Sequence, residues 1–154
     1  MNKVEEFLVE AKTQTYANAN APKITNSRLG SKDYEYQKDN MIYHDTYFGG
    51  TNFIGEEAVY VDNEIYWAMN YHGVTLDDAL NEEVMDIVLR PALMMVGQDD
   101  GIIPVRGPRE FINGNYKYCF EVDGNFDCFY GVERVFVGNK KIYELRCSGG
   151  LIKW

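Results

Sequence analysis

The feature that most constrains the fold is the stretch from Tyr34 to His72, where short runs rich in Tyr, Phe, Val and Ile are separated only by Gly, Asn and Asp. Runs of this kind, bounded by turn residues, indicate consecutive antiparallel strands. We expect these strands near residues 34–38, 41–48, 53–61 and 64–72. A parallel sheet would require a crossover of about a dozen residues between neighbouring strands, and this stretch has no room for one. The sequence therefore excludes a Rossmann-like parallel sheet.

Residues 2–14 have the apolar spacing of an amphipathic helix. The residues at i, i+3, i+4 and i+7 are Val4, Phe7, Leu8 and Ala11. We therefore expect the first element of the chain to be a helix.

A second helix is expected over residues 75–90. Thr75 has the position of an N-cap, Asp78 completes a capping box, and Pro91 is expected to end or kink the helix. Its apolar face would comprise Leu76, Leu80, Val84, Ile87 and Val88.

After this helix and a loop, a second group of strands is expected. These strands lie near residues 111–122, 126–132, 134–137 and 141–147. The order helix, strands, helix, strands predicts a single α+β domain over residues 1–154. We expect a mostly antiparallel, curved sheet of six to eight strands, with an N-terminal helix and a second helix between the two groups of strands.

The third and fourth strands are joined by Asp62 and Asn63, which fit a two-residue hairpin turn because both residue types tolerate positive φ. Counting outward from this turn places Glu56 opposite Met69, on an otherwise apolar face. The apolar residues of that face are Ile54, Ala58, Tyr60, Ile65, Trp67, Met69 and Tyr71. Glu57 falls on the other face, although a slip of one residue would exchange the two glutamates.

A carboxylate on an apolar face must find a cation or several hydrogen bonds, or take up a proton. One interpretation is a structural pair in which Glu56 binds Arg106, Arg109 or backbone amides. The other is a cavity with Glu56 as its polar anchor and aromatic walls. The residues expected to bind a ligand in that case are Glu56, Tyr60, Trp67, Met69, Tyr71 and Arg106. The sequence leaves both interpretations open.

The charge of the chain bears on its partners. It has 24 acidic and 15 basic residues, and its formal charge is −9. Nucleic-acid affinity depends on cationic side chains that neutralise phosphates, so DNA, RNA and anionic membranes are not expected partners. No apolar run approaches the roughly 20 residues that span a bilayer, and Glu5 and Glu6 interrupt the region where a signal peptide would be apolar. We expect a cytoplasmic protein.

The sequence predicts no cofactor and no metal. Gly49 and Gly50 are not followed by the helix and lysine of a phosphate-binding loop. The two histidines, His44 and His72, do not have a recognisable metal-ligand spacing.

The dipeptide Asp123-Gly124 is the strongest two-residue turn signal in the chain. A hairpin with that turn would place Cys119 directly opposite Cys128. We expect neighbouring thiols that can form a strained disulfide on oxidation, and that remain reduced in the cytoplasm.

Three motifs carry a family resemblance. They are Asp45-Thr46-Tyr47-x-Gly49-Gly50-x-x-Phe53-x-Gly55-Glu56-Glu57-Ala58-Val59, then Trp67-x-Met69-Asn70-Tyr71-x-Gly73, then Arg106-Gly107-Pro108. This pattern resembles a family of uncharacterised bacterial proteins known only as a domain of unknown function. The resemblance covers nearly the whole chain and implies no assigned reaction.

From these residues we expect a small-molecule-binding or sensing domain with an aromatic-lined pocket anchored by Glu56. One alternative is an enzyme that uses Glu56 as a general base with a raised pKa. Another is a structural or interaction protein that dimerises through an exposed strand edge or a tyrosine-rich face. The expected partners are therefore a small molecule or a second copy of the chain.

Overall fold

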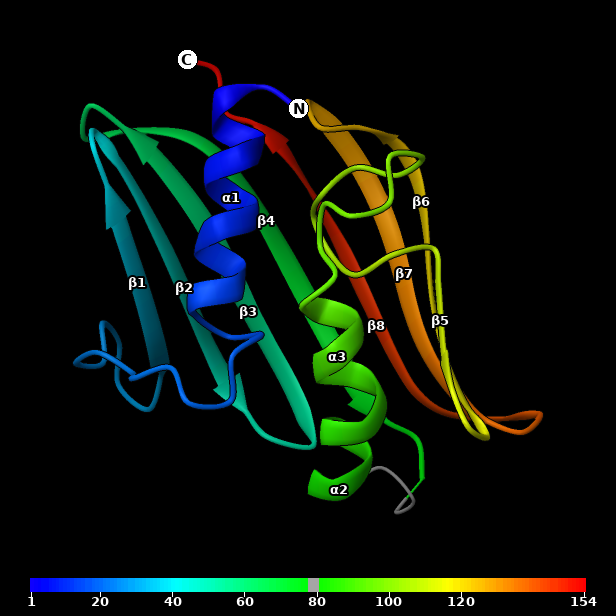
Figure 1. Cartoon of the computed structure of the whole chain (residues 1–154). Coiled ribbons are helices and arrows are strands. Elements are labelled where there is room, and N and C mark those ends of the chain that lie inside the picture. The colour runs from blue at the N-terminus through cyan, green and yellow to red at the C-terminus, as the bar shows by residue number, and fades with distance from the viewer. Residues whose placement is uncertain (78–80) are drawn as a thin grey trace.

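One antiparallel sheet of eight strands organises the molecule, in the order β1-β2-β3-β4-β8-β7-β6-β5 (Figure 1). The computed structural model describes residues 1–77 and 81–154. The sheet consists of two meanders, β1 to β4 and β5 to β8, which meet where β4 pairs with β8. The expected antiparallel sheet of six to eight strands, with an N-terminal helix and a second helix between the strand groups, is confirmed, although the second helix is shorter than expected.

The first meander contains the four strands expected before His72. They are β1 (Lys32–Lys38), β2 (Met41–Gly49), β3 (Asn52–Val61) and β4 (Glu64–Thr75). Asp62 and Asn63 form the turn between β3 and β4, with φ angles of 54° and 66°, as the sequence predicts.

A β-bulge in β4 changes the register that this turn alone predicts. Tyr60 pairs with Ile65, but the next pair is Val59 with Trp67, so Tyr66 is an extra residue on β4. Every pair farther from the turn is therefore shifted by one residue.

The shift exchanges the two adjacent glutamates. Glu57 lies opposite Met69, and Glu56 lies opposite Asn70. The prediction that Glu56 lies on the buried face is therefore wrong: its side chain is exposed, whereas Glu57 is fully buried.

The strands of the second meander have other bounds than expected. They are β5 (Glu110–Asn113), β6 (Tyr116–Asn125), β7 (Cys128–Val137) and β8 (Lys140–Leu151). The strand expected over 111–122 is divided into β5 and β6, and the two strands expected over 126–137 form the single strand β7.

The turn between β6 and β7 does not lie at Asp123-Gly124. Strand β6 continues through these residues to Asn125, which pairs with Cys128, so the turn residues are Phe126-Asp127. The Asn125 side chain accepts hydrogen bonds from the backbone N–H groups of Asp127 (2.9 Å) and Cys128 (3.3 Å). This side chain stabilises the later turn, a local preference that outweighs the Asp-Gly signal.

The shifted turn separates the two thiols that were expected to be neighbours. Cys119 pairs with Arg134, whereas Cys128, the first residue of β7, pairs with Asn125 at the far end of β6, so the expected Cys119–Cys128 contact is wrong. All three cysteines are free: Cys128 is exposed, Cys119 half-buried and Cys147 buried.

We expect the thiols to react in order of their exposure. Burial raises the pKa of Cys147 to about 12, so this thiol forms almost no reactive thiolate in the folded protein. An alkylating reagent at pH 8 should label Cys128 first, Cys119 more slowly and Cys147 only after unfolding, as peptide mass spectrometry can measure. A Cys119–Cys128 disulfide after mild oxidation would contradict the register.

Helix α1 (Lys3–Gln14) is the helix expected over residues 2–14. Asn2 caps it, because its side chain accepts hydrogen bonds from the N–H groups of Val4 (2.9 Å) and Glu5 (3.0 Å). Glu5 in turn accepts a hydrogen bond from the Asn2 N–H (2.6 Å), which completes a capping box. The buried residues of α1 include Phe7, Leu8, Ala11 and Lys12.

The second helix begins later than expected. Thr75 is the last residue of β4, and the N-cap is Asn81, whose side chain accepts a hydrogen bond from the Val84 N–H (3.1 Å). Asp78 and Leu80, which were expected in the capping box and the apolar face, lie outside the described residues.

The second helix also continues past Pro91. It comprises α2 (Glu82–Val84), the π-helical segment η1 (Met85–Leu89) and α3 (Arg90–Leu93). Proline lacks a backbone N–H, and the hydrogen-bond pattern changes to that of a π-helix just before Pro91, so the helix continues at the position where we expected it to end or kink. None of the helices in the described parts of the chain has the length and apolar character needed to cross a bilayer.

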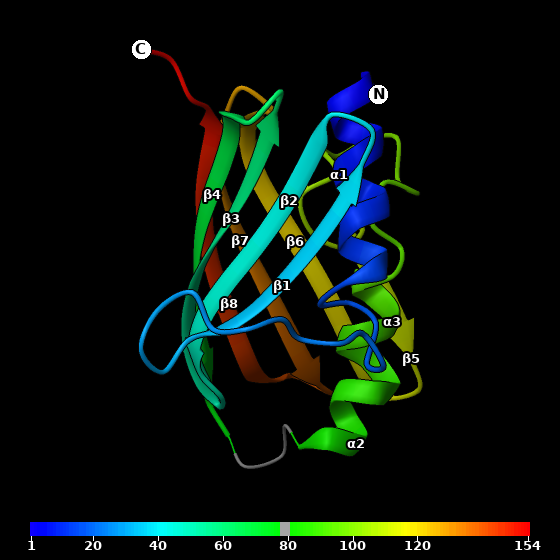
Figure 2. The same ribbon diagram turned by 90° about the vertical axis from the view of Figure 1, so that its left-hand side faces the viewer.

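The helices cover one face of the curved sheet and leave the other uncovered (Figures 1 and 2). We call these the inner face and the outer face. Helix α1 contacts β1 and β2, and η1 contacts β5 and β6. Apolar side chains of the inner face pack against both helices and form the core.

Candidate functional site

Polar side chains meet in the interior, between the inner face and the elements that cover it. We divide them into two clusters. The lysine cluster comprises Lys12, Tyr16, Tyr43, Asp45, Glu57 and Tyr71. The arginine cluster comprises Arg106, Tyr118, Glu133 and Tyr143. Burial of so many charges and hydroxyls opposes folding, so such groups mark either a structural network or a functional site.

The lysine cluster is built around an ion pair between Lys12 and Glu57. Lys12 projects from the last turn of α1, and its ammonium contacts Glu57 Oε2, with both side chains almost inaccessible to solvent. The Lys12 nitrogen lies 5.2 Å from the ring centroid of Tyr16 and 6.0 Å from that of Tyr43. An ammonium is thus held by a carboxylate and two aromatic rings.

Asp45 lies beside this ion pair. It pairs with Glu57 across β2 and β3, so both carboxylates project from the inner face. Tyr71 reaches across from β4 and donates a hydrogen bond to Asp45 Oδ1 (2.6 Å). Glycine at position 55 permits this, because a Cβ there would lie 2.4 Å from the Tyr71 hydroxyl oxygen.

Burial and the neighbouring Glu57 carboxylate raise the pKa of Asp45 to about 7, although the Tyr71 hydrogen bond and the charges of Lys12 and Arg106 oppose this rise. Burial also lowers the pKa of Lys12. The cluster therefore contains a carboxyl group that exchanges its proton near neutral pH.

This shifted pKa makes the stability of the protein depend on pH. Between about pH 4 and pH 7 the folded protein retains a proton on Asp45 that the unfolded chain has released, so Asp45 lowers stability as the pH rises through this window. Asp45→Asn keeps the hydrogen bond to Tyr71 and removes the titration. We expect urea unfolding to show that the variant gains stability relative to wild type as the pH rises from 4 to 7. Above pH 7 the difference between their free energies of unfolding should stay constant. A difference that does not change with pH would contradict the shift.

Three buried polar atoms of the lysine cluster have no hydrogen-bond partner among residues 1–77 and 81–154. They are Glu57 Oε1 and the hydroxyl oxygens of Tyr16 and Tyr43. Buried polar groups are nearly always hydrogen-bonded in folded proteins, so three such atoms in one cluster need an explanation.

The arginine cluster has no such atoms. Arg106 donates two hydrogen bonds to Glu133, from Nε (2.9 Å) and from a terminal nitrogen (2.7 Å). The hydroxyls of Tyr118 (2.7 Å) and Tyr143 (3.1 Å) donate to the same carboxylate, and the Tyr118 oxygen accepts from the Gly107 N–H (2.9 Å). Both oxygens of Glu133 and both tyrosine hydroxyls are hydrogen-bonded, so this network attaches the loop before β5 to the inner face, and we interpret it as structural.

The structure brings together only part of the predicted ligand site. Tyr71 belongs to the lysine cluster, Met69 lies opposite Glu57, and Arg106 belongs to the arginine cluster. Glu56 and Tyr60 lie outside both clusters: Glu56 is exposed and Tyr60 is half-buried.

Trp67 is buried, but it has a different role. Its ring stacks on Phe126 and Phe129, with centroid distances of 5.2 and 6.0 Å, and its Nε1 donates to the Phe126 carbonyl (3.0 Å). Trp67 thus packs the strands together and belongs to neither polar cluster.

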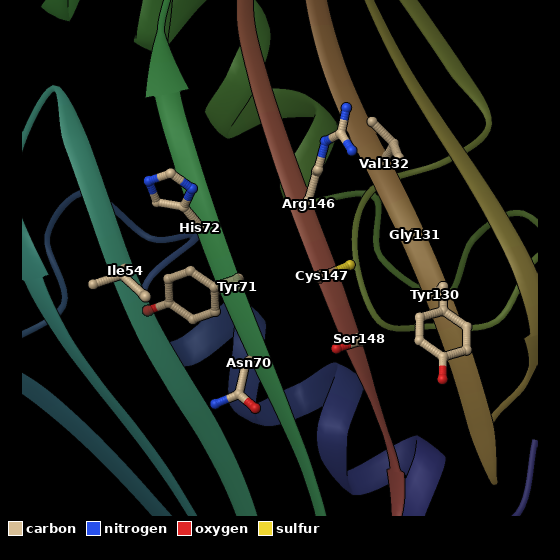
Figure 3. A pocket seen from close by; sticks show the side chains of 10 residues that line it. All are labelled: Ile54, Asn70, Tyr71, His72, Tyr130, Gly131, Val132, Arg146, Cys147 and Ser148. Carbon is tan, nitrogen blue, oxygen red and sulfur yellow. The ribbon is translucent and has the colours of Figure 1, made fainter.

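A shallow pocket of about 420 Å³ crosses the outer face from β3 to β7 (Figure 3). It is lined by Ile54, Asn70, Tyr71, His72, Tyr130, Gly131, Val132, Arg146, Cys147 and Ser148. Asn70 donates to Glu56 (3.3 Å), and Arg146, which is largely exposed, donates to Glu144 (3.1 Å). These polar groups are paired or open to water, so the pocket makes a weaker candidate site than the lysine cluster.

Asp33 is a further buried carboxylate, on β1. It accepts hydrogen bonds from the hydroxyls of Ser27 (2.5 Å) and Ser31 (2.6 Å), and His44 Nε2 lies 2.8 Å from it. These bonds fasten the segment before β1 to the sheet. Within the described residues, no group of His, Cys, Asp and Glu side chains is arranged to hold a metal ion.

Comparison with known families adds one finding. The sequence model of the family described as "Domain of unknown function (DUF5680)" matches residues 45–152, well over half of the chain. A search of curated proteins finds no match. The matched residues include Asp45, Glu57 and Tyr71 of the lysine cluster, whereas Lys12, Tyr16 and Tyr43 precede them.

Proposed function

The chain belongs to the DUF5680 family, a domain of unknown function, and we propose that it is a small-molecule-binding domain whose ligand lies in the lysine cluster. One observation carries the proposal: Glu57 Oε1 and the hydroxyls of Tyr16 and Tyr43 are buried without a hydrogen-bond partner in the described part of the chain. A bound molecule in contact with the cluster would supply the missing hydrogen bonds.

The arginine cluster supports this interpretation by contrast. It lies in the same interior, yet both oxygens of Glu133 and both tyrosine hydroxyls are hydrogen-bonded. A buried donor or acceptor without a partner costs about 1 to 3 kcal/mol. Among the described residues, the fold thus pairs the carboxylate and both hydroxyls of the arginine cluster and leaves three atoms of the lysine cluster unpaired, which favours a ligand at the lysine cluster.

The ligand in this proposal is small and enclosed. Lys12, Tyr43, Asp45 and Glu57 are at most 2% exposed, so a molecule between them would be shielded from water. Helix α1 carries Lys12 and covers the inner face (Figure 2). Entry of a ligand therefore requires α1 to move away from the sheet.

The adjacent glutamates provide a matched test of the site. Glu57→Gln changes the buried carboxylate of the cluster, whereas Glu56→Gln makes the same chemical change on an exposed side chain. We expect native mass spectrometry of freshly purified protein to show a retained small molecule in wild type and Glu56→Gln, and its loss in Glu57→Gln. The spectra also report whether the chain dimerises, the alternative function in which a sheet edge is the interface.

A second pair of variants tests the unpaired hydroxyls. Tyr43→Phe removes a hydroxyl without a partner, so the ligand-free variant should be at least as stable as wild type. Tyr118→Phe removes a hydroxyl that is bonded to Glu133, and it should be less stable. If no molecule is retained and ligand-free Tyr43→Phe loses as much stability as Tyr118→Phe, the Tyr43 hydroxyl is satisfied within the protein and the proposal fails.

The near-neutral pKa of Asp45 favours a second candidate function, an enzyme with Asp45 as general acid or base. In that case wild type should convert the retained molecule during incubation, and Asp45→Asn should bind it unchanged. If the mass of the retained molecule stays the same in both proteins, the enzyme function is contradicted and only the binding function remains.

A further inference from the structure

The charges of the two clusters do not balance once Asp45 is ionised, above about pH 7. Arg106 is paired with Glu133 and Lys12 with Glu57, whereas Asp45 is bonded to the neutral hydroxyl of Tyr71. With Asp45 ionised, the described residues of the clusters carry three negative charges and two positive charges. A bound cation would remove this excess in an interior where an uncompensated charge is costly.

The unpaired atoms need a hydrogen-bond donor. Glu57 Oε1, as an oxygen of an ionised carboxylate, can accept a hydrogen bond but cannot donate one, and the hydroxyl oxygens of Tyr16 and Tyr43 can accept as well as donate. An ammonium group has three N–H donors and no acceptor, so it matches this set. An anionic ligand would instead face Glu57 and Asp45.

The aromatic surroundings are also those of an ammonium site. The Lys12 ammonium already lies 5.2 Å from the Tyr16 ring centroid and 6.0 Å from that of Tyr43. The Arg106 guanidinium lies 5.3 Å from the Tyr16 ring centroid. Aromatic faces attract cations and give no such preference to anions.

We infer that the ligand of the lysine cluster is a small organic cation with a primary ammonium group, which binds Glu57 Oε1 and Asp45 beside Lys12. This inference rests on the proposed function and names the chemical class of its ligand. The ammonium supplies the positive charge that Asp45 lacks, and its N–H groups supply the missing donors.

Binding of a cation is then linked to loss of a proton from Asp45. The charged and titratable groups that act on Asp45 come from every surrounding element, namely Lys12, Tyr16, Tyr43, Tyr47, Glu57, Tyr71 and Arg106. Because the pKa of Asp45 is about 7, a ligand that requires the ionised carboxylate should bind about tenfold more tightly at pH 8 than at pH 6.

The test is an NMR titration of the ¹⁵N-labelled full chain with three probes: ethylammonium, tetramethylammonium and acetate, at constant ionic strength. A probe as small as ethylammonium can reach a dissociation constant of about 1 mM. We expect it to saturate with shifts at the amides of Asp45 and Glu57, and to bind about tenfold more tightly at pH 8 than at pH 6. Tetramethylammonium has the charge without N–H donors and should bind at least tenfold more weakly, and acetate should not bind.

Matched variants locate the effect. Glu56→Gln should bind ethylammonium as wild type does, whereas Glu57→Gln should bind at least tenfold more weakly. Asp45→Asn should lose both affinity and the pH dependence. The inference is overturned if acetate binds as well as ethylammonium, if tetramethylammonium equals it, or if wild-type affinity is the same at pH 6 and pH 8.

The outcomes separate this inference from the proposed function. A retained molecule without a basic nitrogen that is lost in Glu57→Gln would refute the ammonium ligand and leave the binding function standing. No retained molecule and no binding of any probe would refute both.

Discussion

Glu133→Ala is expected to lower the free energy of unfolding by about 3 to 5 kcal/mol, because it leaves the Arg106 guanidinium buried without its carboxylate. The hydroxyls of Tyr118 and Tyr143 lose their acceptor in the same variant. Urea unfolding measures the effect.

Glu121→Ala is the matched control. Glu121 also pairs with an arginine, Arg134 (3.0 Å), but its side chain is 73% exposed. Surface pairs of this kind contribute less than about 1 kcal/mol, so this variant should unfold almost as wild type does. Equal losses in Glu133→Ala and Glu121→Ala would show that the Arg106 pair is accessible to water.

Trp67→Ala is expected to lower the free energy of unfolding by about 3 to 5 kcal/mol, the range typical of a large aromatic residue deleted from a core. The side chain is fully buried, and its loss leaves Phe126 and Phe129 without their stacking partner.

The other tryptophan of the chain provides the control. Trp154 is fully exposed at the C-terminus, so Trp154→Ala should change stability by less than about 0.5 kcal/mol. Trp67→Phe retains an aromatic ring but loses part of the buried ring volume and the hydrogen bond to the Phe126 carbonyl, so its stability should fall between those of Trp67→Ala and Trp154→Ala. A Trp67→Ala protein as stable as Trp154→Ala would contradict the packing of β4 against the β6–β7 turn.

Much of the fold could be predicted from local pattern. The four strands before His72 follow from short apolar runs between turn residues, and Asp62-Asn63 forms the expected turn. These elements depend on neighbours in the sequence. The start of the second helix was misplaced because its cap is Asn81, not Thr75. The π-helical segment before Pro91 was not expected from the sequence.

The identity of the buried glutamate could not be predicted, because it depends on the bulge at Tyr66. Nothing in the residue type of a tyrosine on a strand marks it as an extra residue. One such residue shifts the pairing and so decides between Glu56 and Glu57. The structure therefore has the second of the two registers that the sequence left open, in which a slip of one residue exchanges the two glutamates.

Two charged members of the clusters carry weak sequence signals. Lys12 is four residues after Leu8, so it shares the apolar face of α1. Glu133 is two residues from Gly131 and from Val135 on β7, so all three share the inner face. Neither pattern reveals a partner, because Glu57 and Arg106 approach them only through the tertiary fold.

The sheet order has a consequence for folding kinetics. Each meander is built from hairpins between strands adjacent in sequence, whereas the β4–β8 pairing joins Trp67 to Leu151 and Thr75 to Tyr143. Contacts between residues so distant in the chain form slowly because a long loop must close first. The β4–β8 pairing is therefore the step expected to limit the folding rate. All residues of the lysine cluster precede the second meander in the sequence: they lie on α1, on the segment that follows α1, and on strands β2 to β4. The two carboxylates of the cluster can therefore come together while the second meander is still unfolded.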